Sequence, residues 1–128
     1  MEGYSPTVVD HFENPRNSGV LENPDGQATR SNPAMRVHMM LRVEDGVVRD
    51  VRWQTRGCPA SIASSSFASE MVRGWTLEAI EALQRDSVAK AIGGLPAAKM
   101  HCSALTADVL KAAVSDYRKK IEAHASAV

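Results

Sequence analysis

The stretch that decides the fold covers residues 35–55 and consists of MRVHMMLRVEDGVVRDVRWQT. Alternation along its first half is typical of a strand with one buried face. The residues expected on the buried face are Met35, Val37, Met39, Leu41 and Val43, and those on the other face are Arg36, His38, Met40 and Arg42. Asp45-Gly46 is a hairpin turn, so residues 47–55 are predicted to return as a second strand, with one face formed by Val47, Val51 and Trp53.

Helical patterns lie on both sides of this hairpin. Ser5-Pro6 begins a short helix that ends at Asn14-Pro15. Turn-forming Asn, Gly and Pro residues recur from Asn14 to Pro33, so this segment is expected to be a loop. After the hairpin, capping residues and apolar spacing predict four helices, over residues 59–73, 76–83, 86–92 and 103 to about 123.

A hairpin followed by helices that must cover one sheet face implies an α+β fold. The sequence therefore predicts a small antiparallel β-sheet covered by several helices, with a long C-terminal helix. A chain of 128 residues is long enough for one core and short for two, so a single domain over residues 1–128 is expected.

Composition excludes several classes of function. Fifteen basic and fifteen acidic residues cancel, so no overall field attracts nucleic acid or an anionic membrane. Aromatic residues make up 5% of the chain, too few for a base-stacking platform. No apolar run has membrane-spanning length, and the first residues do not resemble a secretory signal. A cytoplasmic protein with no nucleic-acid or membrane partner is expected.

Two cysteines, Cys58 and Cys102, are each predicted at a helix N-terminus. Pro59 suits the first helical position after Cys58, and Cys102 follows His101 just before the last helix. A helix N-terminus lowers a thiol pKa, and thiolates bind soft metals and attack electrophiles. From the cysteines alone, metal or sulfur chemistry and a plain core position for two small residues are equal alternatives. Either thiol could share a site with the start of the first strand, near Met35.

Three motifs occur in order along the chain. They are YS at residues 4–5 with DHFENPRN at 10–17, GCPASIASSS at 57–66, and KMHCS at 99–103. Together they resemble the iron–sulfur cluster scaffold proteins of the IscU/NifU N-terminal type, from Tyr4 to about Lys119. The resemblance implies an α+β scaffold or carrier that assembles a [2Fe–2S] cluster from iron and cysteine-derived sulfur and passes it on. Such a protein is expected not to be an enzyme. It also implies a cysteine desulfurase as partner.

The resemblance also implies a ligand set. The family site uses three cysteines, an aspartate and a histidine, of which this chain matches Cys58, His101 and Cys102. The family's first cysteine and its aspartate fall on Met35 and Val37. The spacing between the two cysteines lacks the insertion of the zinc-dependent SufU branch, so the IscU-like branch fits better.

The two replacements leave the ligand set incomplete. A thioether carries no charge and valine cannot ligate at all, so the three remaining donors cannot supply the four that a [2Fe–2S] cluster takes. Met35 itself and His38 are the nearest additional candidates for the metal. In an extended strand His38 points away from the face of Val37, which favours a structural role for it.

A further departure concerns a chaperone. The family commonly carries Leu-Pro-Pro-Val-Lys before the histidine, which an Hsp70-type chaperone recognises. This chain has Leu95, Pro96 and Lys99 but Ala97 and Ala98 between them. A lost proline makes an extended bound segment costlier to order, so weakened chaperone docking is expected.

Other polar residues are assigned structural roles. His11 lies in a predicted helix and is expected to be a hydrogen-bonded structural histidine. The run Ser64-Ser65-Ser66 has no His or Asp partner in its sequence context and is expected to allow close helix packing.

Three hypotheses of function remain. In the first, the protein is a scaffold or carrier whose coordination is completed by a non-family donor, a second protomer or a small thiol. In the second, a degenerate scaffold keeps a zinc site at Cys58, His101 and Cys102 and acts as a regulator or binding module. In the third, Cys102 accepts persulfide from a desulfurase and Cys58 resolves it. The first is preferred because the resemblance covers nearly the whole chain.

Overall fold

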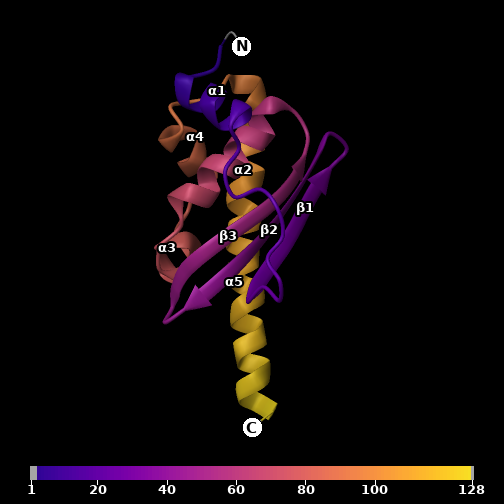
Figure 1. Ribbon diagram of the computed structural model, residues 1–128, viewed down its shortest axis with the longest axis vertical. Helices are drawn as coiled ribbons and strands as arrows, with labels where there is room; N and C mark the ends of the chain where they lie inside the picture. The colour runs from indigo at the N-terminus through magenta and orange to yellow at the C-terminus, as the bar shows by residue number, and fades with distance from the viewer. Residues whose placement is uncertain (1–2, 128) are drawn as a thin grey trace.

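A three-stranded antiparallel sheet with helices behind one face is the framework of the molecule (Figure 1). The computed structural model describes residues 3–127. Its elements, in chain order, are α1 (Pro6–Glu13), β1 (Gly26–Asn32), β2 (Met35–Glu44), β3 (Val47–Arg56), α2 (Pro59–Met71), α3 (Leu77–Glu81), α4 (Ser87–Ala91), the 3-10 helix η1 (Ala97–Lys99) and α5 (Met100–Ala127).

The sheet and two of the helices enclose the core. The strands lie in the order β1-β2-β3, and α5 runs behind the sheet against β1 and β2 while α2 packs on β3 (Figure 1). The largest fully buried side chains include Met39, Leu41, Val51, Val109 and Leu110. The arrangement confirms the predicted α+β fold with its long C-terminal helix.

The prediction that residues 14–33 form only a loop is wrong, because β1 lies within this segment. Its sequence GQATRSN has one apolar residue, no hydrophobic alternation and three residue types that strands disfavour. Two external constraints make it a strand: pairing with the edge of β2 and close packing on α5. A Cβ on Gly26 would lie 2.4 Å from the carbonyl oxygen of Ala113, so only glycine permits this approach.

A register shift corrects one predicted residue of β3. Val47 was expected on the buried face with Val51 and Trp53, but it is half-buried and Val48 is buried instead. The ladder pairs Val43 with Val48 and Arg42 with Asp50, so Arg49 is the extra residue of a β-bulge. A bulge inserts one residue and moves the preceding side chains to the opposite face.

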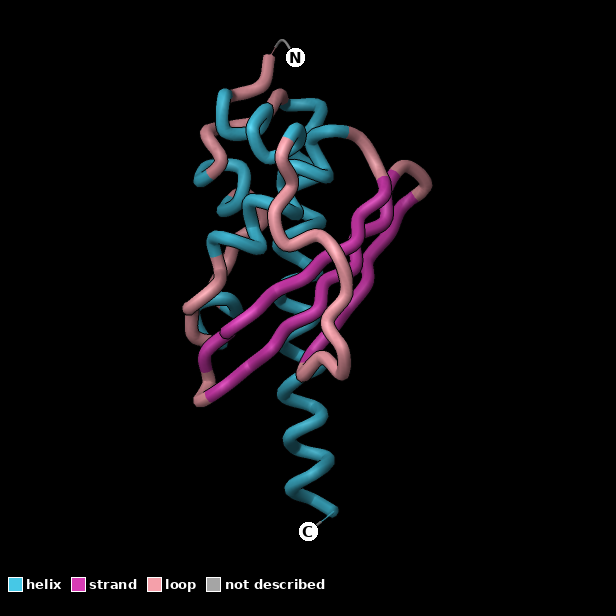
Figure 2. The backbone as a smooth tube through the Cα atoms, viewed as in Figure 1, coloured by secondary structure: helices cyan, strands magenta, loops and turns pink. Residues whose placement is uncertain are grey.

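The loop from Asn14 to Asp25 covers part of the outer face of the sheet, as the tube in Figure 2 shows. Arg42 donates from its guanidinium to the carbonyl oxygens of Glu22 and Asn23 at 2.6 and 2.8 Å. Met40, expected on the polar face, is only 2% exposed. Part of the outer face of the sheet is therefore also buried, beneath this loop.

Small side chains allow α2 to pack closely against its neighbours. Five of its serines are fully buried, namely Ser61, Ser64, Ser65, Ser66 and Ser69. Several hydroxyls bond within the helix or to the sheet; Ser65 Oγ, for example, donates to Ser61 O at 2.9 Å and lies 2.8 Å from Thr55 Oγ1. Close packing is the role predicted for the serine run.

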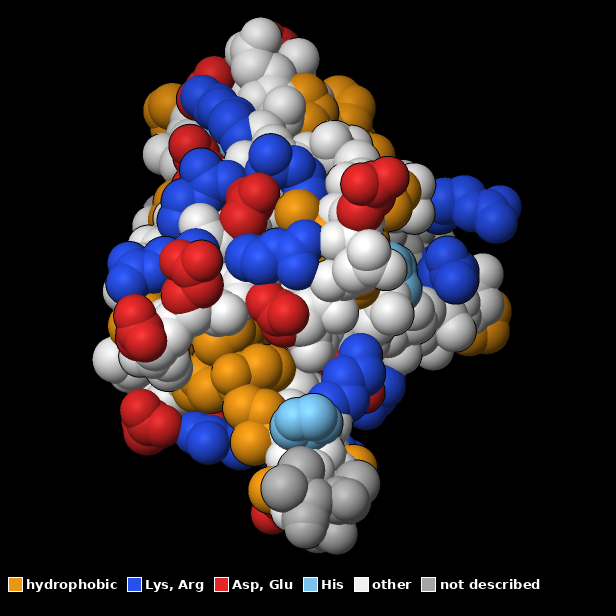
Figure 3. All heavy atoms as spheres, turned by 60° about the horizontal axis from the view of Figure 1, so that its bottom comes forward, with side chains coloured by type: hydrophobic (Ala, Val, Ile, Leu, Met, Phe, Trp, Pro, Cys, Tyr) orange, Lys and Arg blue, Asp and Glu red, His pale blue; other side chains and the backbone are white. Residues whose placement is uncertain are grey.

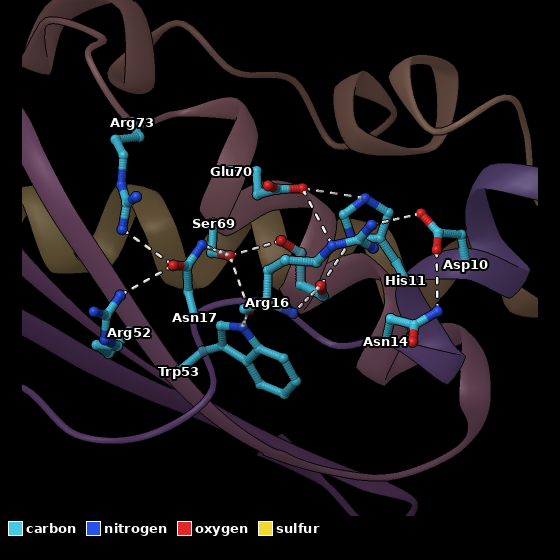
Figure 4. A network of polar contacts seen from close by, with 11 residues as sticks. Asp10, His11, Asn14, Arg16, Asn17, Arg52, Trp53, Ser69, Glu70 and Arg73 are labelled. Atoms are coloured by element: carbon cyan, nitrogen blue, oxygen red, sulfur yellow. Dashed lines mark hydrogen bonds and ion pairs between the residues drawn. The ribbon is translucent and has the colours of Figure 1, made fainter.

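A polar network ties the N-terminal segment to α2 (Figure 4). His11 is 5% exposed, and its Nδ1 lies 2.7 Å from Ser66 Oγ, which also accepts from the Arg16 N–H at 2.9 Å. His11 Nε2 lies 3.5 Å from a carboxylate oxygen of Glu70. The structural role predicted for His11 is confirmed, and this histidine, 55 residues away in sequence, is a partner for the serine run that its sequence context does not contain. Ser66 is fully buried, so this Ser-His-Glu arrangement is closed to a substrate.

Charges of both signs are interleaved over the surface in Figure 3. Arg118, for example, bonds to the carboxylates of both Glu78 and Glu81, and Arg73 bonds to Asp50. Within residues 3–127, no helix is both long enough and apolar enough to cross a membrane.

We expect His11 to make the protein less stable in acid. Burial, followed by the Arg16 guanidinium, lowers the pKa of His11, against the opposing charges of Glu70 and Asp10. Below about pH 6.5 the unfolded state therefore binds a proton that the folded state resists, and the free energy of unfolding falls as pH falls. Urea denaturation between pH 5 and 8 measures it.

The variant His11→Gln removes this titrating group and should show a smaller loss of relative stability between pH 7 and 5. His124→Gln is the matched control, because His124 is exposed near the end of α5. The same pH dependence in wild type, His11→Gln and the control would refute this account of His11.

Candidate thiol site

Two helix N-termini bring the cysteines together. Cys58 is the N-cap residue of α2, with Pro59 at the first helical position as predicted. Cys102 lies in the first turn of α5, which begins at Met100, three residues before the predicted start. The two Sγ atoms are 3.6 Å apart, although 44 residues separate the cysteines in sequence. Both thiols are free, and the fold places them side by side.

His101 and Lys99 border this thiol pair on the α5 side. His101 is exposed, and its Nε2 lies 3.6 Å from Cys102 Sγ. Lys99, the last residue of η1, is close enough for its charge to act on the Cys102 thiol. In the described part of the chain, no three His, Cys, Asp or Glu side chains converge closely enough to hold a metal ion.

The environment of Cys58 favours its thiolate. Burial alone would raise the pKa of this thiol, but the nearby Ser61 N–H, Cys102 thiol and Ala60 N–H together stabilise the thiolate by more and lower the pKa. These N–H groups belong to the first turn of α2, which is the effect predicted for a cysteine at a helix N-terminus. Cys58 is half-buried and so is accessible to reagents.

The same prediction is wrong for Cys102. This thiol is fully buried, and burial together with the neighbouring Cys58 raises its pKa to about 12. Desolvation of the charged form outweighs the helix N-terminus and the attraction of Lys99. In the metal-free protein Cys102 is therefore a neutral thiol that shares a hydrogen bond with the Cys58 sulfur.

Met35, at the start of the first strand, lies close to Gly57, the residue before Cys58. It is 5% exposed and belongs to the same buried cluster as Cys102, with Cys58 packed against it. A Cβ placed on Gly57, the residue before Cys58, would meet Met35 Cβ at 3.0 Å and Ser61 Oγ at 2.4 Å. Gly57 therefore permits the close contact between the start of β2 and the N-terminus of α2.

His38 lies elsewhere. Its Nδ1 forms a short hydrogen bond with Thr29 Oγ1 in the neighbouring strand β1. Its alternation with Met35 and Val37, both buried with the core, places it on the outer face of the sheet. The structure therefore does not bring His38 to the thiols, and the structural role that the sequence favoured for it agrees with this contact.

The segment Leu95–Lys99 adjoins the site. Leu95 packs against the core, while Ala97 to Lys99 form η1 with Lys99 N–H bonded to Pro96 O at 2.8 Å. The segment Leu95–Lys99, for which weakened chaperone docking is predicted, therefore ends in a single turn of 3-10 helix.

Sequence reasoning missed Gly57 and Ser61 as parts of the site. Ser61 donates from Oγ to the carbonyl oxygen of Cys58 at 2.7 Å, and its own N–H bonds to the same oxygen at 3.0 Å. The glycine directly before a helix-capping cysteine was the available signal, because a glycine there permits close backbone packing.

Comparisons with known proteins agree with this arrangement. Residues 3–124 match the family described as NifU-like N terminal domain. The chain is 48% identical over 119 residues to iron-sulfur cluster assembly scaffold protein IscU 1 of Archaeoglobus fulgidus, covering 91% of this chain and 78% of that protein. It is 40% identical over 126 residues to IscU of Escherichia coli strain K12, covering 94% and 98%.

A solved structure shares the fold. The N-terminal part of a nitrogen-fixing NifU-like protein from Brucella abortus superposes with a TM-score of 0.72 at 24% identity, covering 92% of this chain and 96% of that one.

We expect alkylating reagents to distinguish the two thiols. Cys58 is accessible with a lowered pKa, whereas Cys102 is buried with a raised one. Iodoacetamide should therefore modify wild type once, and should modify Cys58→Ser at least roughly tenfold more slowly than Cys102→Ser. Intact-protein mass spectrometry under anaerobic conditions measures both rates. Equal rates for the two variants would contradict this description of the site.

We expect Gly57→Ala to strain the site. Its φ of 157° and its contacts with Ser61 and Met35 both oppose a side chain, so the free energy of unfolding should fall by about 1–3 kcal/mol. Gly19→Ala is the matched control, since Gly19 also has positive φ, 135°, but nothing within 4 Å of its added Cβ. Equal losses in urea denaturation would show that crowding at Gly57 contributes nothing.

Proposed function

The chain belongs to the NifU-like N-terminal domain family, and we propose that it is an iron–sulfur cluster assembly scaffold or carrier with an altered ligand set. Two relatives that are 48% and 40% identical carry the name of such a scaffold. In this proposal the protein holds a cluster as cargo and catalyses no reaction.

The observation that carries the proposal is the 3.6 Å separation of the Cys58 and Cys102 sulfurs. Two thiolates bound to one tetrahedral metal ion by bonds of about 2.3 Å lie about 3.8 Å apart. The pair is thus already spaced for a single metal ion, without movement of either helix. Binding replaces the protons of both thiols, so the raised pKa of Cys102 is an energetic cost that the metal offsets.

The rest of the ligand set differs from the family pattern. His101 is exposed beside Cys102, with its Nε2 3.6 Å from the Cys102 sulfur, and is the third donor in this proposal. Met35 carries a neutral thioether and belongs to the same buried cluster as Cys102, and Val37 is fully buried in the core. A cluster held here therefore needs a donor from outside the Cys58, His101 and Cys102 set.

The same geometry bears on sulfur delivery by a cysteine desulfurase, the partner we propose. A persulfide from such an enzyme meets Cys58 first, because Cys102 is fully buried. Acceptance by Cys102, the thiol that the sequence suggested, requires a movement that exposes its sulfur. Cytoplasmic location and weak docking of an Hsp70-type chaperone stay predictions.

A second candidate function is a zinc-binding regulatory module. The same sulfur separation and the adjacent imidazole of His101 supply three donors, the usual number for a zinc site that keeps an open position. The two candidates differ in whether inorganic sulfide is retained with the metal.

The test is anaerobic reconstitution with iron, cysteine and a desulfurase, followed by desalting. Restoring a thiol with Met35→Cys should increase retained iron and sulfide several-fold, because it adds a charged donor beside the pair. Met39→Cys is the matched control: Met39 lies on the same strand and face and is fully buried, but four residues further along. The double variant Met35→Cys, Val37→Asp, which restores the family pattern, should retain at least as much.

Loss of either thiol should abolish retention. Cys58→Ser and Cys102→Ser are expected to keep the fold by circular dichroism and to lose bound iron and sulfide, whereas His38→Gln should keep both. A wild-type protein that retains zinc but no sulfide, with no gain in Met35→Cys, would favour the zinc-binding module. Full retention in Cys102→Ser would refute both candidates.

A further inference from the structure

Two arginines stand directly opposite each other at the end of the sheet nearest the thiols. Arg36 in β2 pairs with Arg56 in β3, and both side chains are exposed. Neither forms an ion pair with any carboxylate in residues 3–127, although most arginines of this chain do. Like charges directly opposite each other destabilise a sheet. An anion between the two guanidinium groups would relieve this repulsion, and no carboxylate in residues 3–127 supplies it.

A hollow of about 310 Å³ lies between these arginines and the turn that joins β1 to β2. Its lining includes Ser31, Asn32, Met35, Arg36, Arg56 and Gly57. Gly57 directly precedes Cys58, and Met35 packs close to Gly57 and belongs to the same buried cluster as Cys102. In Figure 3, Lys or Arg side chains protrude at the right-hand edge, the side on which this turn lies.

The site beside the hollow is poor in negative charge. Met35 and Val37 supply none, and the positive charges of Lys99, Arg36 and Arg56 lie around the same end of the molecule. A metal or cluster at Cys58 and Cys102 also lacks a donor from outside the Cys58, His101 and Cys102 set. An external anion that also offers a metal donor would correct both deficits together.

We propose that this hollow binds a small thiol that carries carboxylates, of the class of cysteine and its short peptides. The carboxylates pair with Arg36 and Arg56, and the thiol passes Gly57 at the end of the sheet to reach Cys58, where it donates to the metal. This inference rests on the proposed scaffold function for the role of the thiol, but the anion site itself does not.

Size and chemistry favour a small molecule over a protein segment. The hollow is at the lower end of the volumes of small-ligand pockets, about 300–1,000 Å³. Arginine forks bind carboxylates through paired charge-assisted hydrogen bonds, which fixes orientation as well as charge. Asn32 is not available to the ligand through its side-chain oxygen, because that oxygen accepts from the N–H groups of Ala34 and Met35 at 2.8 and 3.0 Å.

The first arm of the test uses the metal-free protein and reduced glutathione as probe. Calorimetry or NMR titration should show one binding site, equally well filled by S-methylglutathione, since the carboxylates anchor the molecule. The double variant Arg36→Gln, Arg56→Gln should bind about tenfold more weakly or worse. Arg30→Gln, Arg49→Gln is the control with the same change of net charge at positions outside the hollow, and it should bind as wild type does.

The second arm measures iron and sulfide retained after reconstitution with iron(III) and inorganic sulfide, because free cysteine in the mixture would itself belong to the proposed class of ligand. Glutathione should increase retention several-fold in wild type, whereas S-methylglutathione and the neutral thiol 2-mercaptoethanol should not. The Arg36→Gln, Arg56→Gln variant should lose the gain, and Met35→Cys should no longer need it.

Four results would overturn the proposal. Absent binding to the metal-free protein, or binding that both double variants retain equally, removes the anion site. Equal retention of iron and sulfide with glutathione and with S-methylglutathione would show that the thiol of the bound molecule is not a ligand of the metal. Tighter binding of a hexaglutamate peptide, lost in Arg36→Gln, Arg56→Gln, replaces the small thiol with an acidic protein segment. If no thiol and no variant retains a cluster, the scaffold function fails, and the ligand role fails with it, while the first arm still decides the anion site.

Discussion

The approach of two helix N-termini, which sets Cys58 and Cys102 side by side, is the constraint on which the rest of the site depends. Buried serines of α2 keep this helix close to its neighbours, and α2 in turn packs against α5. Gly57 removes the side chain that would separate α2 from the start of β2. Each of these small residues buries less side-chain area than a larger residue would, and in doing so allows the two sulfurs to lie close together.

That proximity has unequal effects on the two thiols. The N–H groups of the first turn of α2 reach Cys58, and its pKa falls; Cys102 is fully buried, and its pKa rises. Cys58 is therefore the reactive thiol. Cys102 stays protonated and buried until a metal replaces its proton or a movement of its surroundings exposes it. The same asymmetry suits a site that loads cargo from outside, because entry occurs at one sulfur first.

Sequence patterns were sufficient for much of the fold and for the identity of the thiol pair. Alternation predicted β2, and capping residues with apolar spacing predicted the helices. The strand β1 could not be predicted, because its residues are not apolar and its form is imposed by β2 and α5. The bulge at Arg49 likewise follows from strand pairing and not from local preference.

The site shows the same division between local and tertiary causes. A helix N-terminus is visible in sequence, but the desolvation that raises the pKa of Cys102 depends on packing of the whole core. The contact of His11 with Ser66 joins residues 55 positions apart, which no local pattern contains. The unpaired arginines beside Met35 became evident only once strand register placed Arg36 opposite Arg56.

The most direct test of the account is Mössbauer spectroscopy of the wild-type protein, reconstituted anaerobically with isotopically enriched iron, cysteine and a desulfurase, and desalted. The account predicts a diamagnetic pair of ferric ions with two distinct quadrupole doublets of equal area, because one iron is bound by Cys58 and Cys102 and the other by different donors. A paramagnetic spectrum of isolated iron, or no bound iron, would contradict it.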